Sequence, residues 1–169
     1  MKSTKKLSIL ALMTTISLVI FVIESAIPTL VPIPGVKLGL ANIITLIFIL
    51  NKMPKEAAIV LFMRIVLASI FAGQMTSFIF SIAGGVLCLI AMFLIHKIAG
   101  NKYIWFTSII GAIFHNIGQI IAAMFVLSST YVLYYFPFLL VSGIITGLFT
   151  GLCAYFLQPH LKNLFSEIR

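Results

Sequence analysis

The sequence predicts an all-α, polytopic integral membrane protein: a bundle of six transmembrane helices that forms a single domain. Hydrophobic residues make up 62% of the 169 residues and charged residues only 8%, far from the averages of soluble domains. The apolar residues form long runs that short polar gaps separate. Since one span needs about 20 apolar residues, the chain has room for about six spans and for no soluble enzymatic domain.

Turn-forming residues divide the apolar runs. Prolines and a glycine between residues 28 and 35 make the first break, and the polar stretch 51–54 makes the second. We expect an outer loop at 27–37 and a short cytoplasmic tail at 159–169, in which residues 160–169 form an amphipathic helix on the inner membrane surface. The expected helices lie at about 7–26, 38–51, 56–73, 76–96, 103–127 and 137–158.

The basic residues predict the orientation. If the N-terminus is cytoplasmic, they gather on the inner side and only Lys37 lies on the outer side, which is the usual bias of the cell membrane. Both termini are therefore expected in the cytoplasm. This bias explains the net charge of +8, so no nucleic-acid partner is predicted. The inner set is Lys2, Lys5, Lys6, Lys52, Lys55, Lys97, Lys102, Lys162 and Arg169.

The acidic residues and the cysteines limit the possible chemistry. Glu24, Glu56 and Glu167 are the three acidic residues, so the chain has no aspartate and no aspartate-rich magnesium motif. Cys88 and Cys153 lie in apolar runs without the spacing of a metal site or a redox pair. We expect no catalytic residues, no metal and no cofactor.

Of the charged side chains, Glu24 and Arg64 lie inside the long apolar runs and not in the gaps between them. A charge at that depth costs about 2.5–3.5 kcal/mol, and an arginine does not lose its proton. One interpretation is a structural ion pair. The other is that both face an outward-opening cavity, where Arg64 binds an anionic group.

A polar stripe marks the fifth helix. His115 and Gln119 are four residues apart and share a face, with Asn116 beside them. Such groups serve either as interhelical hydrogen bonds, worth about 0.6 kcal/mol each, or as ligand contacts.

The first loop has more constraint than a linker needs. Three prolines and two glycines lie between Pro28 and Asn42, which suits a rigid lid or a tight re-entrant loop. Lys37 would add a second positive charge for an anionic ligand, and Asn42 a directional hydrogen bond.

An ordered set of motifs carries a resemblance over nearly the whole chain: Glu24-Ser25, PGVKLGLAN at 34–42, Arg64, residues 81–85, HNIGQ at 115–119 and SGIITG at 142–147. Together they resemble the Gx transporter family, also called heptaprenyl diphosphate synthase component I. That family is similar to the substrate-binding S components of energy-coupling factor (ECF) transporters.

The resemblance implies a non-enzymatic subunit that binds a small anionic or amphipathic solute, such as a flavin, a quinone- or isoprenoid-related compound or a vitamin. It implies an ECF coupling subunit with ATPases as partners, docked on an AxxxA-like pattern whose nearest match is Ala11 to Thr15. The alternative is an accessory subunit of a prenyl diphosphate synthase or of a Gram-positive extracellular electron transfer assembly. The expected ligand contacts are Glu24, Lys37, Asn42, Arg64, His115, Asn116 and Gln119.

Overall fold

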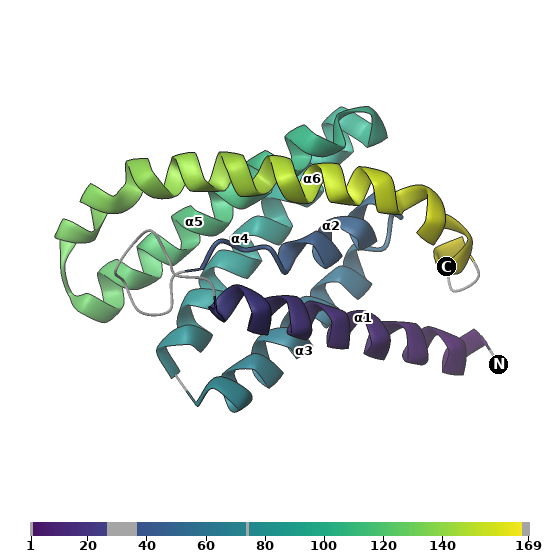
Figure 1. The fold of residues 1–169 in the computed structure, drawn as a ribbon, viewed down its shortest axis with the longest axis horizontal. Coiled ribbons are helices and arrows are strands. Elements are labelled where there is room, and N and C mark those ends of the chain that lie inside the picture. The colour runs from purple at the N-terminus through teal and green to yellow at the C-terminus, as the bar shows by residue number, and fades with distance from the viewer. Residues whose placement is uncertain (1, 27–36, 74, 167–169) are drawn as a thin grey trace.

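The computed structural model describes residues 2–26, 37–73 and 75–166, and the regular elements in these ranges are all helical, as predicted. Figure 1 shows them as an elongated bundle in which α1 begins and α6 ends at the same end. The elements are α1 (Lys2–Ala26), α2 (Asn42–Leu50), α3 (Pro54–Ala72), α4 (Met75–Ala99), the 3-10 helix η1 (Gly100–Tyr103), α5 (Ile104–Leu127), the 3-10 helix η2 (Thr130–Tyr135) and α6 (Phe136–Ser166).

Helix α5 packs against both α4 and α6, while α1 packs against α3. Glycines allow these close contacts. A Cβ atom added at Gly118 would lie 2.4 Å from the backbone oxygen of Ala83 in α4, and one at Gly147 would lie 2.6 Å from Cα of Ile109. The polar stripe of α5 is thereby held between two neighbouring helices.

Helix α2 is short and fully enclosed. All nine of its residues are buried, and the helix contacts α3, α4 and α6. At about 1.5 Å per residue it covers less than half of a bilayer core of about 30 Å. The helix expected at 38–51 therefore starts later, at Asn42, because residues 37–41 are not helical and Gly39 has a φ of +83°.

The C-terminal part of the chain also differs from expectation. Helix α6 continues through Pro159 to Ser166, so the short helix expected as a separate tail is continuous with α6 over its described residues. Its end is anchored, since Phe165 is buried and packs edge-to-face on Phe48 of α2 with ring centroids 5.0 Å apart. Of the predicted outer loop, residues 27–36 lie outside the described residues.

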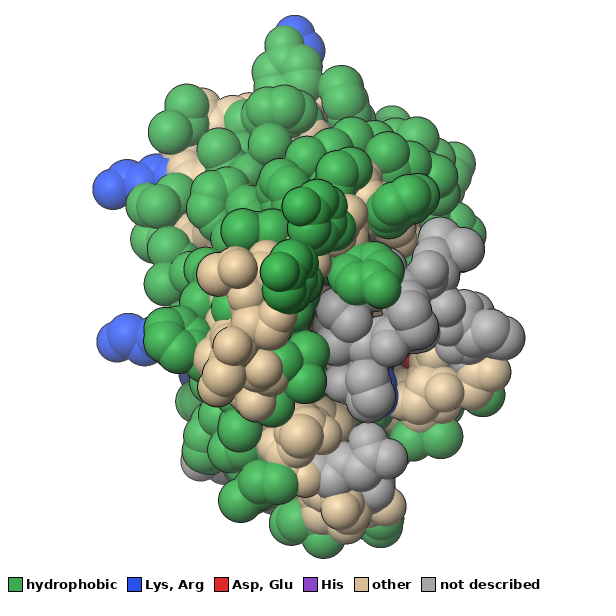
Figure 2. All heavy atoms as spheres, turned by 90° about the vertical axis from the view of Figure 1, so that its left-hand side faces the viewer, with side chains coloured by type: hydrophobic (Ala, Val, Ile, Leu, Met, Phe, Trp, Pro, Cys, Tyr) green, Lys and Arg blue, Asp and Glu red, His purple; other side chains and the backbone are tan. Residues whose placement is uncertain are grey.

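Three helical stretches among the described residues are long and apolar enough to cross a membrane, at Thr4–Ala26, Met75–Leu127 and Thr130–Ser166. Large hydrophobic side chains such as Phe71 and Phe125 are 74% and 81% exposed, and hydrophobic atoms cover much of the described surface in Figure 2. Lipid is the environment that suits such a surface. These features indicate a multi-pass membrane protein.

Candidate functional site

Most of the sequence-predicted ligand contacts gather where α1 ends and α2 begins. Lys37 is half-buried there, and the others are at most 4% exposed although all are polar or charged: Glu24, Asn42, Arg64, His115, Asn116 and Gln119. They come from α1, α2, α3 and α5. A buried polar side chain is costly unless it has a hydrogen-bond or charge partner. The contacts within this cluster therefore either stabilise the fold or prepare the side chains to bind a ligand.

Part of the cluster supports the non-helical segment 37–41. Glu24 Oε1 accepts a hydrogen bond from the N–H of Gly39 at 2.6 Å, and Gln119 Oε1 accepts one from the N–H of Lys37 at 3.3 Å. Thr146 of α6 donates to the carbonyl of Leu38 at 3.5 Å. Irregular backbone at membrane depth requires such partners. Glu24 and Gln119 therefore hold the entry to α2.

His115 is enclosed between this segment and α4. A Cβ at Gly39 would lie 2.9 Å from the imidazole Cδ2, and one at Gly84 would lie 2.8 Å from Cε1 and Nδ1. Glycine at both positions makes room for the ring. Gly39 also has a backbone conformation that side chains other than glycine rarely adopt.

Two cations lie close to the ring of Phe21 in α1. The Lys37 ammonium is 3.4 Å from the ring centroid, and the Arg64 guanidinium carbon is 5.7 Å from it. Both distances suit cation–π attraction. The Lys37 ammonium also donates to the hydroxyl of Ser25, and the ring thus brings the two positive charges into one cluster.

Arg64 and Glu24 attract each other electrostatically, but no direct ion pair between them is among the contacts of the described residues. The hydrogen bond found for Arg64 in that part of the chain is a long one, from Nη2 to Asn42 Oδ1 at 3.4 Å. A guanidinium has five N–H donors. Among the described residues, most of its hydrogen-bonding capacity is therefore unused.

The asparagines carry further unused groups. Within the described residues, Asn42 Nδ2 and Asn116 Oδ1 are buried without a hydrogen-bond partner. Asn42 shares the cluster with Arg64. Asn116 is tied to α6, because its Nδ2 donates to the carbonyl of Leu139 at 2.6 Å. The structure thus brings six of the seven predicted residues around segment 37–41, and links Asn116 to α6.

Phe21, Ser25 and Thr146 belong to the site but were not among the predicted contacts. Phe21 precedes Glu24 by three residues and so lies one helical turn away on the same face of α1. That spacing could have identified Phe21 as a site residue from the sequence. Nothing in the sequence pattern relates Thr146 to the first loop.

The two predicted docking residues, Ala11 and Thr15, lie on the exposed face of α1. The hydroxyl of Thr15 donates to the carbonyl of Ala11 at 3.0 Å, and that of Ser8 donates to the carbonyl of Thr4 at 3.1 Å. These hydroxyls are satisfied within their own helix. The stripe of small residues Thr4, Ser8, Ala11 and Thr15 is thus free to contact lipid or another helix.

The cluster and the fold can be compared with known proteins. The family described as heptaprenyl diphosphate synthase component I matches residues 13–157, which is most of the chain. The chain belongs to this family. The resemblance seen in the sequence motifs is thereby confirmed, and the matched range includes every predicted ligand contact. No curated protein and no solved structure matches the chain.

Proposed function

We propose that the chain is a non-catalytic, S-component-like membrane subunit that binds a small anionic or amphipathic solute for an ATP-driven transporter. One observation carries the proposal: within the part of the chain that the structure describes, Arg64 is buried with most of its hydrogen-bonding capacity unused, beside a second cation, Lys37. A buried charge that lacks partners is costly. An anionic group bound at this point would satisfy it.

The charges of the cluster favour an anion. Arg64 and Lys37 together outweigh the one carboxylate, Glu24, which is already engaged with the N–H of Gly39. Asn42 Nδ2 offers another donor that no described residue uses. The buried hydrophobic residues Phe21, Ala41 and Ala68 pack together beside the cluster. They suit a solute with a hydrophobic body, as in flavins, quinone- or isoprenoid-related compounds and some vitamins.

In the proposed topology the chain crosses the cell membrane six times, with both termini in the cytoplasm. Five crossings are α1, α3, α4, α5 and α6, each of 19 residues or more. The sixth is discontinuous and consists of segment 37–41 with the buried α2. Non-helical backbone is tolerated at that depth because neighbouring side chains satisfy it.

Energy would come from partner proteins. The chain has no phosphate-binding glycine-lysine motif, so a coupling subunit and ATPases would supply ATP hydrolysis. The stripe that includes Ala11 and Thr15 is the proposed docking surface, because small exposed residues let two membrane helices approach closely.

The test is affinity purification of the tagged protein from native membranes in mild detergent, followed by mass spectrometry of bound proteins and small molecules. We expect a coupling subunit, paired ATPases and an anionic or amphipathic solute. Arg64→Gln should lose the solute and keep the proteins, while Thr15→Phe should lose the proteins and keep the solute. If the wild-type protein carries neither, the proposal is wrong.

The family's description favours a second candidate, a non-catalytic accessory subunit of a prenyl diphosphate synthase. The catalytic role is not proposed, because the chain has no aspartate for a magnesium-diphosphate motif. Recovery of a synthase in the same experiment, without ATPases, would favour this role. Recovery of redox proteins would instead favour an electron transfer assembly.

A further inference from the structure

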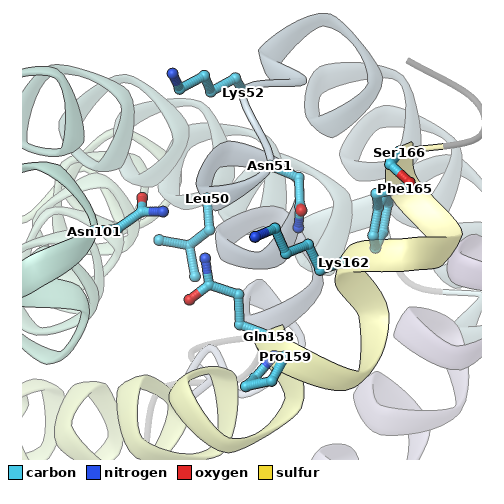
Figure 3. A pocket seen from close by; sticks show the side chains of 9 residues that line it. All are labelled: Leu50, Asn51, Lys52, Asn101, Gln158, Pro159, Lys162, Phe165 and Ser166. Carbon is cyan, nitrogen blue, oxygen red and sulfur yellow. The ribbon is translucent and has the colours of Figure 1, made fainter.

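A second polar region lies at the end of the molecule where α2 ends. There the described residues line an open cavity of about 850 Å³ between the end of α2, η1 and the last turns of α6 (Figure 3). None of the residues expected to bind ligand lines it. We call it the lysine-rich cavity, after Lys52 and Lys162 in its wall.

The local sequence explains why this cavity exists. Pro159 lacks the N–H that would bond within α6, and Phe165 anchors the following turn on Phe48 of α2. The end of α6 thereby passes over the end of α2. The space between them is left open and is lined by polar side chains.

The lining is basic and rich in amides. Two lysines and three primary amides contribute to it, and its described lining residues include no carboxylate. In Figure 3 the side chains of Lys162 and Gln158 extend into the same space below Leu50, with Asn51 beside Lys162. Lys52 lies above this space, and its ammonium extends away from Lys162. The third amide is that of Asn101.

The backbone at Lys52 is unusual. Lys52 has a φ of +59° and follows α2 at a position where glycine is the usual residue. The N–H groups of Lys52 and Met53 close the end of the helix by bonding Ile49 and Phe48 at 2.9 Å. A lysine in this conformation costs free energy that glycine would avoid, which is consistent with use of its side chain.

A neighbouring cavity of about 590 Å³ shares Lys52 and Asn101 with the first and adds Lys97 and His96. Within the described residues, Nδ1 of His96 is buried and has no hydrogen-bond partner. The two neighbouring cavities are thus both lined by basic and neutral hydrogen-bond donors.

We propose that the lysine-rich cavity binds a phosphate group, carried by a lipid headgroup or by a soluble phosphorylated compound. A phosphate has several acceptor oxygens and up to two negative charges, which match two ammonium groups and several amide donors better than a single carboxylate does. The site is separate from the cluster around Arg64, and the proposal does not depend on the proposed transport function.

The test uses the purified full-length protein in phosphatidylcholine nanodiscs with two probes. Soluble pyrophosphate is titrated by calorimetry, and phosphatidic acid is added to the nanodiscs with bound lipid counted by native mass spectrometry. The variants are Lys162→Gln and Lys52→Gly, the latter suited to the backbone at that position. Lys102→Gln is the matched control, because it removes a neighbouring positive charge that does not line either cavity.

Lys162→Gln should weaken binding of the effective probe about tenfold, Lys52→Gly less, and Lys102→Gln little. Pyrophosphate as the effective probe identifies a soluble ligand, and phosphatidic acid alone identifies a lipid headgroup; both support a phosphate site. Failure of the wild-type protein to bind either probe would overturn the proposal. An equal loss in Lys102→Gln would also overturn it, because binding would then reflect net charge.

Discussion

The two polar regions of this protein use positive charge in opposite ways. Around segment 37–41, Arg64 is 4% exposed and is surrounded by helices, and its neighbours are fixed by hydrogen bonds or ring contacts. At the lysine-rich cavity, Lys52 and Lys162 are exposed on an open wall. The cluster around Arg64 is therefore needed for stability as well as being a candidate site. The lysine-rich cavity can lose a charge at little cost to the stability of the fold.

This difference predicts a ranking of mutational effects. Removing one partner of a buried charged cluster leaves the others uncompensated and costs several kcal/mol. Exposed charges contribute about 0–1 kcal/mol, because water and salt screen them. Stability should thus respond strongly to changes near Arg64 and weakly to changes at the lysine-rich cavity.

The largest effect is expected for Arg64→Ala. It should lower the free energy of unfolding by about 3 kcal/mol, because it removes the cation that faces Glu24 and leaves a void beside Phe21. Lys162→Ala should change it by no more than about 0.5 kcal/mol. Thermal denaturation in one detergent measures both.

A double variant separates charge from packing. Arg64→Leu combined with Glu24→Gln removes both charges and fills part of the space, so it should be more stable than Arg64→Ala. Equal losses for Arg64→Ala and Lys162→Ala would show that the two regions do not differ as described.

Gly39→Ala should have the next largest effect. A side chain at a φ of +83° costs about 1–2 kcal/mol, and its Cβ would lie 2.9 Å from the ring of His115, so crowding adds about 1 kcal/mol or more. Gly73→Ala is the control, because Gly73 has a φ of +62° and nothing within 4 Å of the added atom.

Denaturation of both alanine variants, with and without His115→Ala, tests the contact. The cost of Gly39→Ala should fall when His115 is removed, while the cost of Gly73→Ala should not. Without such coupling the two residues are not packed as the structure has them.

The sequence predicted much of this arrangement because the bilayer constrains it. Polar residues inside apolar runs must face the interior, which is why Glu24, Arg64, His115 and Gln119 could be named as one cluster. The division of roles inside the cluster was not predictable. Whether Glu24 binds a cation, Arg64 or a backbone N–H depends on where segment 37–41 folds, and periodicity does not reveal that.

The short buried α2 and the course of α6 show the same limit of prediction from sequence. Residues 42–50 are as hydrophobic as a transmembrane segment, so hydropathy could not show that the helix starts after Gly39. Pro159 is a usual signal for the end of a helix, but the packing of Phe165 on Phe48 holds the next turns in place. Tertiary contacts decided both boundaries.

The smallest effect is expected for the ion pair between Lys6 of α1 and Glu56 of α3, whose charged atoms are 2.5 Å apart. The geometry is good, but the Lys6 side chain is 38% exposed, so the pair should contribute less than about 1 kcal/mol. A double-mutant cycle with Lys6→Gln and Glu56→Gln measures this coupling, which added salt should reduce further. A coupling above about 2 kcal/mol would mean that this end of the bundle is as shielded from water as the cluster around Arg64. The contrast between the two regions would then arise from their different partners and not from exposure.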